Sequence, residues 1–306
     1  MGRFILRRLL QGFLVVLGVS LVVFVAMRVF GDPAKVMLPL SATAEQRAEF
    51  EHLIGLDRPL PEQFVTFLGD LATLDFGESL WQRRPAMDVV FERLPNTLML
   101  IGAGLGLAII LALPLGAIAA LRPGGVIDRI TVIGGLAGLS TPQFWLGLLL
   151  ILLFAVNLRW LPTSGYGGLP YLILPALTLA LPSLARMVLL GRSQGIDELN
   201  QQYVKTARAK GLRFHQVLFG HALRNTLIPF VTLAGWEVIS ALAGYTVVVE
   251  TVFAWPGLGL TAIQAIQRND LFLLQAIVFT VAIAIVLVNI LLDIVYKLID
   301  PRIKLA

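Results

Sequence analysis

The stretch YVKTARAKGLRFHQVLFGHALRNTLIP, from Tyr203 to Pro229, lies between two apolar segments of this chain. It is too basic and too polar to cross a membrane, yet its apolar residues recur at helical spacing. Gly211 interrupts that pattern, so the stretch predicts short surface helices on either side of a turn. A membrane protein with such a segment is expected to be driven by a partner that binds there.

Composition indicates that the chain is a membrane protein. Hydrophobic residues make up 57% and charged residues 14% of its 306 positions, and the mean hydropathy is +0.83. Soluble domains average roughly 45–50% apolar and about 25% charged residues. A bilayer core of about 30 Å needs about 20 apolar residues in each helix that crosses it. The sequence therefore predicts an all-α membrane protein with about six transmembrane helices. The six stretches that are long enough are Leu9–Met27, Thr97–Leu121, Ile130–Val156, Leu169–Leu190, Leu227–Val249 and Phe272–Val295.

The first apolar stretch has a second interpretation, because Arg3, Arg7 and Arg8 precede it as they would a cleaved signal peptide. Its apolar run is longer than the 7–15 residues typical of a signal peptide, and no clear cleavage site follows before Gly31. Residues 1–30 are therefore interpreted as an N-terminal transmembrane helix.

The distribution of Lys and Arg sets the orientation. With the N-terminus inside, the two short outer loops carry only Arg159 and Arg268, and the inner segments carry most other basic residues. The positive-inside rule then places both termini in the cytoplasm. The same bias accounts for the net charge of +5, so nucleic-acid binding is not supported.

Residues 31–96 form the one long outer segment, which is acidic and predicts helices over Ala44–Ile54 and Leu60–Leu74. Its prolines divide it into pieces too short to be stable alone, so it should pack on the spans or on a partner. A lid or docking element and a plain connector remain open alternatives.

The chain lacks the residue patterns of catalytic or metal sites. It has no cysteine, no G-x-x-x-x-G-K-[ST] phosphate-binding loop and no G-x-S-x-G. His52, His215 and His221 are not spaced with further ligands for a metal. An enzyme, and in particular an embedded hydrolase, is therefore disfavoured, and transport remains.

Small residues and prolines within the spans suit a transport pathway. Glycines such as Gly102, Gly106, Gly134 and Gly135 are expected to let helices pack closely. Prolines interrupt the spans and permit kinks. These prolines are Pro114, Pro142, Pro175 and Pro182.

Few charges lie inside the predicted spans. Glu237 lies about eight residues into the fifth span, at roughly 12 Å depth by helical rise. It should face a bundle interior or a water-filled cavity and pair with a donor. Structural pairing and substrate contact both remain open for it. Arg186 lies about one turn from the inner end of its span and is expected to snorkel to the interface. Glu250 and Asp293 lie near span ends and are expected to have no special role.

The opening stretch resembles the coupling loop of permease subunits of binding-protein-dependent ABC importers, whose pattern is E-A-A, three residues, G, nine residues and I-x-L-P. Here Lys205-Thr206-Ala207 stands for E-A-A, Gly211 follows at the right spacing, and His221-Ala-Leu-Arg224 replaces I-x-L-P. These departures, with the later proline at Pro229, resemble the dipeptide, oligopeptide and nickel branch. Three further stretches are similar to signatures of that branch, namely Leu139–Gly147, Val247–Gly259 and Leu298–Ile303.

The resemblance implies a type I-like ABC importer permease fold in a bacterial cytoplasmic (inner) membrane. Residues 97–306 would form a five-helix core with a cytoplasmic coupling loop at 195–226. The implied partners are a second homologous permease subunit, two cytoplasmic ATPase subunits that bind ATP and Mg²⁺, and an extracytoplasmic substrate-binding protein; this chain itself would bind no cofactor. Small peptides are the favoured cargo, with nickel or a peptide-like or glycoside cargo as alternatives.

Two groups of candidate functional residues follow from this resemblance and from the span charges. Gly211 would supply the turn between two coupling helices because glycine tolerates positive φ. The ATPase-coupling candidates are Tyr203, Lys205, Thr206, Ala207, Arg208, Lys210, Gly211, Leu212, Val217, Leu218 and His221. The translocation-pathway candidates are Glu237, Gln143 and Asn96. Glu237 departs from the uncharged residue expected in relatives.

A secondary transporter or channel is the alternative from a different class. Such carriers often contain inverted repeats and midplane carboxylates that bind ions. No repeat is detectable here, and Glu237 is the one deeply placed acid in the predicted spans.

Overall fold

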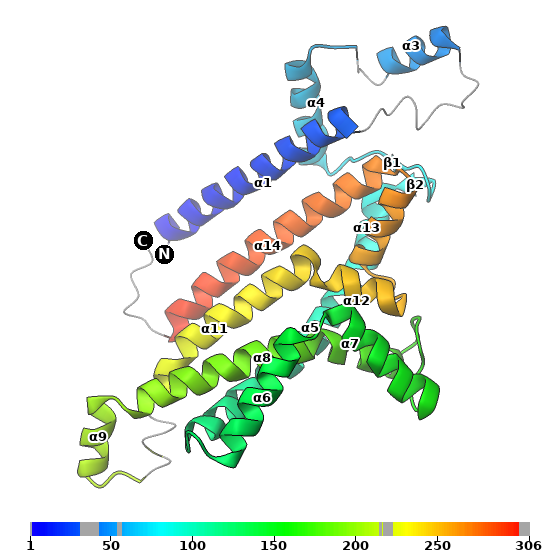
Figure 1. The fold of residues 1–306 in the computed structure, drawn as a ribbon. Helices are drawn as coiled ribbons and strands as arrows, with labels where there is room; N and C mark the ends of the chain where they lie inside the picture. Colours follow the sequence, from blue (N-terminus) through cyan, green and yellow to red (C-terminus); the bar gives the residue numbers. More distant parts are fainter. Residues whose placement is uncertain (1, 31–42, 54–56, 214–215, 217–222, 300–306) are drawn as a thin grey trace. The chain divides into compact units, whose positions relative to one another are not determined.

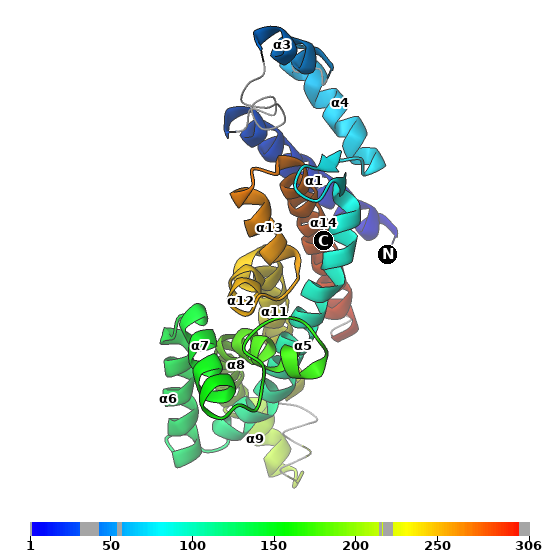
Figure 2. The same ribbon diagram turned by 90° about the vertical axis from the view of Figure 1, so that its right-hand side faces the viewer.

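We describe the protein from a computed structural model of the full chain, which describes residues 2–30, 43–53, 57–213, 216 and 223–299 (Figures 1 and 2). These residues form helices and one short antiparallel hairpin. Five described helices are long and apolar enough to cross a membrane, and a bent pair makes a sixth if it is counted as one span. The prediction of an all-α membrane protein with about six spans is confirmed.

The chain divides into two compact units, the first of which comprises residues 1–96 and 257–286. Its elements are α1 (Gly2–Phe30), α3 (Ala44–Leu53), α4 (Leu60–Thr73), β1 (Glu78–Ser79), β2 (Arg84–Pro85), the start of α5 (Ala86–Ala120), α13 (Leu258–Gln267) and the start of α14 (Leu271–Ile299). Helices α3 and α4 match the two predicted in the long outer segment.

The fully buried carboxylate of Asp270 organises the first unit. It accepts hydrogen bonds from the Ser79 hydroxyl at 2.5 Å and the Trp81 amide at 3.1 Å, which hold the β1–β2 hairpin. It also accepts a hydrogen bond from the Leu273 amide at 3.1 Å, and so caps the start of α14. Val89 and Leu273 belong to the hydrophobic core of the unit, and Trp81 packs against it. One buried side chain thus joins the hairpin to the start of α14.

The second unit comprises residues 97–256 and 287–306. Besides the remainder of α5 and α14, its elements are α6 (Val126–Ser140), α7 (Gln143–Leu150), η1 (Ile151–Asn157), α8 (Leu169–Leu199), α9 (Gln202–Ala209), α11 (Leu223–Ser240), η3 (Ala241–Tyr245) and α12 (Thr246–Phe253). Helix α8 is the most buried of the candidate spans and packs against α6, α7, α11 and α12.

The predicted single span Ile130–Val156 is instead two helices, α6 and α7 with η1, that meet at a bend of 105°. Pro142 has no backbone N–H, and the preceding Thr141 is extended, with φ −86° and ψ 119°. In contrast, α8 continues through Pro175 and Pro182. A proline therefore breaks a helix here only where the residue before it leaves the helical conformation.

Several helices extend beyond their predicted ends. Helix α5 begins at Ala86 rather than Thr97, and α8 continues to Leu199 rather than Leu190. The added turns contain charged residues such as Glu92 and Arg192. Hydropathy predicts only the part of a helix that lies in the apolar core of the bilayer, and the helix itself can continue beyond it into more polar surroundings.

Close contacts between helices depend on a few glycines. At Gly116 in α5, an added Cβ would lie 3.0 Å from the Val188 carbonyl oxygen and 3.0 Å from the Arg192 nitrogen, both backbone atoms of α8. At Gly135 in α6, an added Cβ would lie 2.8 Å from Cγ of the Leu189 side chain of α8. Of the glycines predicted to pack, Gly102, Gly106 and Gly134 have no atom within 4 Å of such a Cβ.

We predict that Gly116→Leu lowers the thermal stability of the detergent-purified chain. The new side chain would have to separate two helix backbones, and overpacking of this kind costs about 1–3 kcal/mol. Gly102→Leu, on the same helix but with open space around the position, is the matched control. Equal melting temperatures for the two variants would contradict the close α5–α8 contact.

Candidate functional site

The segment predicted to bind an ATPase contains α9, a short helix that follows α8. Val204 and Ala207 on one side of it are buried. The other described coupling candidates are exposed, namely Tyr203, Lys205, Thr206, Arg208, Lys210, Gly211 and Leu212. Helix α9 therefore has an anchored apolar face and an exposed basic face.

The end of α9 has the turn that the sequence predicts. Gly211 has φ +80°, a left-handed conformation that favours glycine. Its amide donates to the Arg208 carbonyl at 3.0 Å, and the Leu212 amide donates to the Ala207 carbonyl at 3.3 Å. These two bonds form a Schellman motif, which ends the helix and reverses the chain. Val217, Leu218 and His221, the remaining coupling candidates, lie outside the described residues.

Three polar side chains fasten α9 to the ends of two spans. The Tyr203 hydroxyl donates a hydrogen bond to the Glu198 carboxylate in the last turn of α8. The Asn225 amide at the start of α11 donates to the Tyr203 hydroxyl at 3.0 Å and to Glu198 at 3.3 Å. Burial, and secondarily the nearby carboxylate, raises the pKa of Tyr203, which stays protonated at neutral pH. A displacement of α9 would therefore pull on both α8 and α11.

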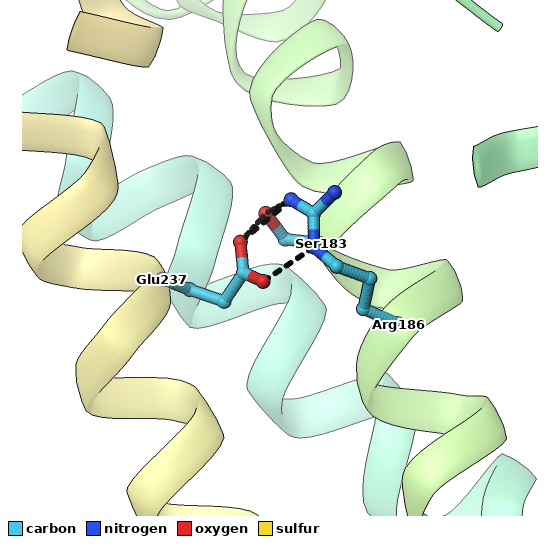
Figure 3. A network of polar contacts seen from close by, with 3 residues as sticks. All are labelled: Ser183, Arg186 and Glu237. Atoms are coloured by element: carbon cyan, nitrogen blue, oxygen red, sulfur yellow. Dashed lines mark hydrogen bonds and ion pairs between the residues drawn. The ribbon is translucent and has the colours of Figure 1, made fainter. Parts of the chain in front are cut away.

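Glu237, the first pathway candidate, pairs inside the second unit (Figure 3). Its carboxylate on α11 receives hydrogen bonds from Arg186 Nε at 2.5 Å, Arg186 Nη2 at 2.8 Å and the Ser183 hydroxyl at 2.7 Å, all from α8. Glu237 and Ser183 are each 1% exposed. The expectation that Glu237 pairs with a donor is confirmed. The expectation that Arg186 snorkels is wrong, because two of its nitrogens are bound to a buried carboxylate.

A second ion pair on α8 was not predicted from the sequence. Arg192 donates to the buried carboxylate of Asp128 on α6 through Nε and, at 2.8 Å, through Nη2. The Gly124 amide also donates to Asp128, at 2.7 Å. Helix α8 is thus joined by one arginine to α6 and by another to α11.

The other two pathway candidates are not partners of Glu237. Gln143 is partly exposed in the first turn of α7, directly after the Pro142 bend, and Asn96 is partly exposed on α5 in the other unit. Their role in a pathway stays a prediction. Glu250, which was expected to have no special role, is fully buried and accepts a hydrogen bond from the Thr97 hydroxyl at 2.6 Å.

Within the described part of the chain, no group of three or more His, Asp or Glu side chains is placed to hold a metal ion.

Comparison with known proteins identifies the family. The family model described as "Binding-protein-dependent transport system inner membrane component" matches residues 112–305, and the corresponding N-terminal model matches residues 1–101. The chain belongs to this family. It is an inner-membrane transport permease of bacterial type.

Curated relatives of this permease match it over nearly their full lengths. Identity is 36% over 316 residues to the oligopeptide transport system permease protein AppB of Bacillus subtilis (strain 168), covering 99% of this chain and 100% of that protein. It is 39% over 333 residues to the di/tripeptide permease DppB of Pseudomonas aeruginosa (strain UCBPP-PA14), covering 98% of each. It is 35% over 305 residues to the glutathione permease GsiC of Escherichia coli (strain K12), covering 99% of each.

A solved structure supports the permease fold. The inward-facing MetNI methionine ABC transporter contains a chain that matches 70% of this permease and 97% of its own length, with a TM-score of 0.58 and 18% sequence identity. At this identity the likeness concerns the fold alone. The predicted ABC importer permease fold is confirmed.

We predict that Glu237→Ala strongly destabilises the permease, because it leaves the Arg186 guanidinium without its buried partner. Removal of one member of a fully buried pair typically costs about 3–5 kcal/mol, and because the Arg186 side chain is 31% exposed, a smaller loss is expected here. Replacement of both residues by apolar ones is often nearly neutral. Thermal unfolding of the purified permease should therefore rank Glu237→Ala below the double variant Arg186→Met/Glu237→Met. The reverse order of melting temperatures would show that the stability of the fold does not depend on each charge having the other as its partner.

Proposed function

We propose that this permease imports small peptides across the inner membrane and that partner ATPases drive it through α9. The observation that carries this proposal is the form of the coupling segment. An exposed basic helix, closed by Gly211 at positive φ, is fastened by Tyr203 to the ends of α8 and α11. Membership of a binding-protein-dependent transport family supports an outside donor of cargo.

In this proposal the chain binds no nucleotide, and ATP with Mg²⁺ is held by two cytoplasmic ATPase subunits. The exposed Lys205 and Arg208 of α9, and Lys210 directly after it, would face an acidic rim on one of these ATPase subunits. When ATP closes the ATPase pair, α9 moves with it, and α8 and α11 follow as rigid elements between an inward-open and an outward-open state. A second homologous permease subunit completes the pathway.

The topology required by this mechanism places both termini and residues 195–226 in the cytoplasm, and residues 31–96 on the outer side. The positive-inside rule supports this orientation. An extracytoplasmic binding protein would deliver cargo on the side of residues 31–96.

Peptide cargo is supported by the names of the relatives, which are permeases for oligopeptides, di/tripeptides and glutathione. Transport of nickel or a glycoside within the same kind of system has no comparable support among these relatives. A secondary transporter or channel does not require a cytoplasmic helix like α9, which exposes basic residues and is linked through Tyr203 to two spans.

The Gly211 turn gives a direct test. We predict that Gly211→Val lowers ATP-dependent uptake of labelled trialanine by the complete reconstituted transporter about tenfold or more. A β-branched residue at positive φ is strained and would distort the docking turn. Gly211→Asn is the matched control, because asparagine tolerates the left-handed conformation, and should retain most uptake.

Both Gly211 variants should be present in the membrane at the wild-type level. Full retention of coupled uptake by Gly211→Val would contradict the docking role of the turn. Uptake of trialanine without ATPases or ATP would contradict the ATP-driven mechanism and favour a secondary transporter or channel.

A further inference from the structure

Arg186 is a charged residue within α8 whose side chain is only partly covered by neighbouring helices. Its side chain is 31% exposed, whereas that of its partner Glu237 is 2% exposed. It lies on α8 six positions before Arg192, which corresponds to about 9 Å of helical rise. A guanidinium at such a position is costly against lipid, so its exposed part is expected to face water or another polar group.

The Glu237 carboxylate fixes the orientation of this guanidinium. Nε and Nη2 of Arg186 both bind Glu237, and Nη2 also lies 3.5 Å from the Ser183 hydroxyl. A two-point contact of this kind holds the planar group in one position. Arg186 therefore cannot extend toward either membrane surface while the pair is intact.

One edge of Arg186 remains available. Among the described residues, Nη1 has no hydrogen-bond acceptor, and Figure 3 shows this nitrogen pointing away from Glu237. The Tyr245 ring lies beneath the guanidinium, with 5.7 Å between Cζ and the ring centroid, and Tyr245 is 40% exposed. The Tyr245 hydroxyl also has no partner among the described residues. Two hydrogen-bond donors on neighbouring, partly exposed side chains thus have no partner among the described residues.

Tyr245 lies on an irregular part of its span. It ends η3, a π-helical segment in which Gly244 departs from helical geometry. The Ala241 carbonyl accepts both the Thr246 backbone N–H, five residues on as in a π-helix, and the Thr246 hydroxyl at 2.9 Å. π-helical segments of this kind occur frequently at functional sites. The irregular turn, together with the paired arginine, marks this part of the second unit as a candidate binding site.

We propose that Nη1 of Arg186 and the Tyr245 hydroxyl bind the C-terminal carboxylate of a peptide during its passage through the permease. Glu237 and Ser183 are positioning residues that hold the guanidinium. A carboxylate fits because it accepts the hydrogen bonds that guanidinium and hydroxyl groups donate. The terminal carboxylate is also present on every linear peptide, whatever its side chains. This inference rests on the proposed peptide transport and adds the group of the cargo that is recognised.

The test compares trialanine with trialaninamide, which lacks the terminal carboxylate. Uptake of each labelled peptide is measured in proteoliposomes that contain the complete transporter, with the same saturating binding protein throughout. The variant is Arg186→Gln/Glu237→Gln, which removes both charges and leaves no unpaired buried carboxylate. Any preference of the binding protein for one peptide is the same for the wild-type and the variant transporter, so it cancels when their uptake ratios are compared.

We expect the variant to lower uptake of trialanine about tenfold relative to trialaninamide, as for loss of a charge-assisted hydrogen bond. Tyr245→Phe removes only one donor without changing any charge, and should lower the same ratio about threefold. The matched control Asp128→Asn/Arg192→Gln removes the other ion pair of α8 and should affect both peptides equally.

An equal effect of Arg186→Gln/Glu237→Gln on both peptides would overturn the proposal, because a contact with lipid or with a second permease subunit does not depend on the cargo's carboxylate. If Arg186→Gln/Glu237→Gln fails to assemble, an unchanged ratio in Tyr245→Phe would overturn it instead. If the wild-type transporter takes up neither peptide, the proposed function itself is wrong, and the two failures are thereby distinguished.

Discussion

The pairing of Arg186 with Glu237 shows the constraint on which the second unit depends. Hydrocarbon offers no water to satisfy a polar group, so charges within a span must find partners inside the protein. Helix α8 carries two arginines that do so on different neighbours, Asp128 on α6 and Glu237 on α11. These pairs and the glycine contacts with α5 fix the rotation of α8 about its own axis. They also make α8 the helix through which neighbouring spans are connected.

This arrangement links the coupling segment to the candidate cargo site. Helix α9 follows α8 and is fastened to α8 and α11 by Tyr203, and the Arg186–Glu237 pair joins the same two helices farther along their length. Both contacts lie within one compact unit. A movement that starts at α9 therefore needs no separate route to reach Arg186. In the proposed mechanism it would be transmitted by two packed helices that are already joined by the Arg186–Glu237 ion pair.

Much of the fold follows from the sequence because lipid imposes a length and a composition on each span. The approximate positions of the spans, the two helices of the outer segment and the positive φ of Gly211 are all predictable from local pattern. The partner of Glu237 is not, because Arg186 is 51 positions away and the pairing depends on how each helix is rotated about its axis. Depth along a helix can be read from sequence, whereas the side that faces a neighbour cannot. Two opposite charges in apolar spans were the available signal for this pair.

The effect of a proline on a span is also only partly predictable from local sequence. Pro142 breaks its span, whereas Pro175 and Pro182 lie inside a continuous helix of the same unit. The residue type is the same in each case, and the difference lies in the extended conformation of Thr141. Local sequence therefore identifies where a kink is permitted, while tertiary packing decides where it occurs.

The central claim, that α9 is the site where a cytoplasmic ATPase drives the permease, is most directly tested by site-specific crosslinking. The chain contains no cysteine, so a single introduced cysteine can carry a thiol-reactive photo-crosslinker without background. Lys205→Cys places the probe on the exposed face of α9, and Ser164→Cys places it on an exposed loop predicted to face outward. In membranes that contain the complete transporter, the probe at position 205 should crosslink to the ATPase, and the probe at position 164 should not. A crosslink to the ATPase from position 164, with none from position 205, would contradict both the topology and the coupling role of α9.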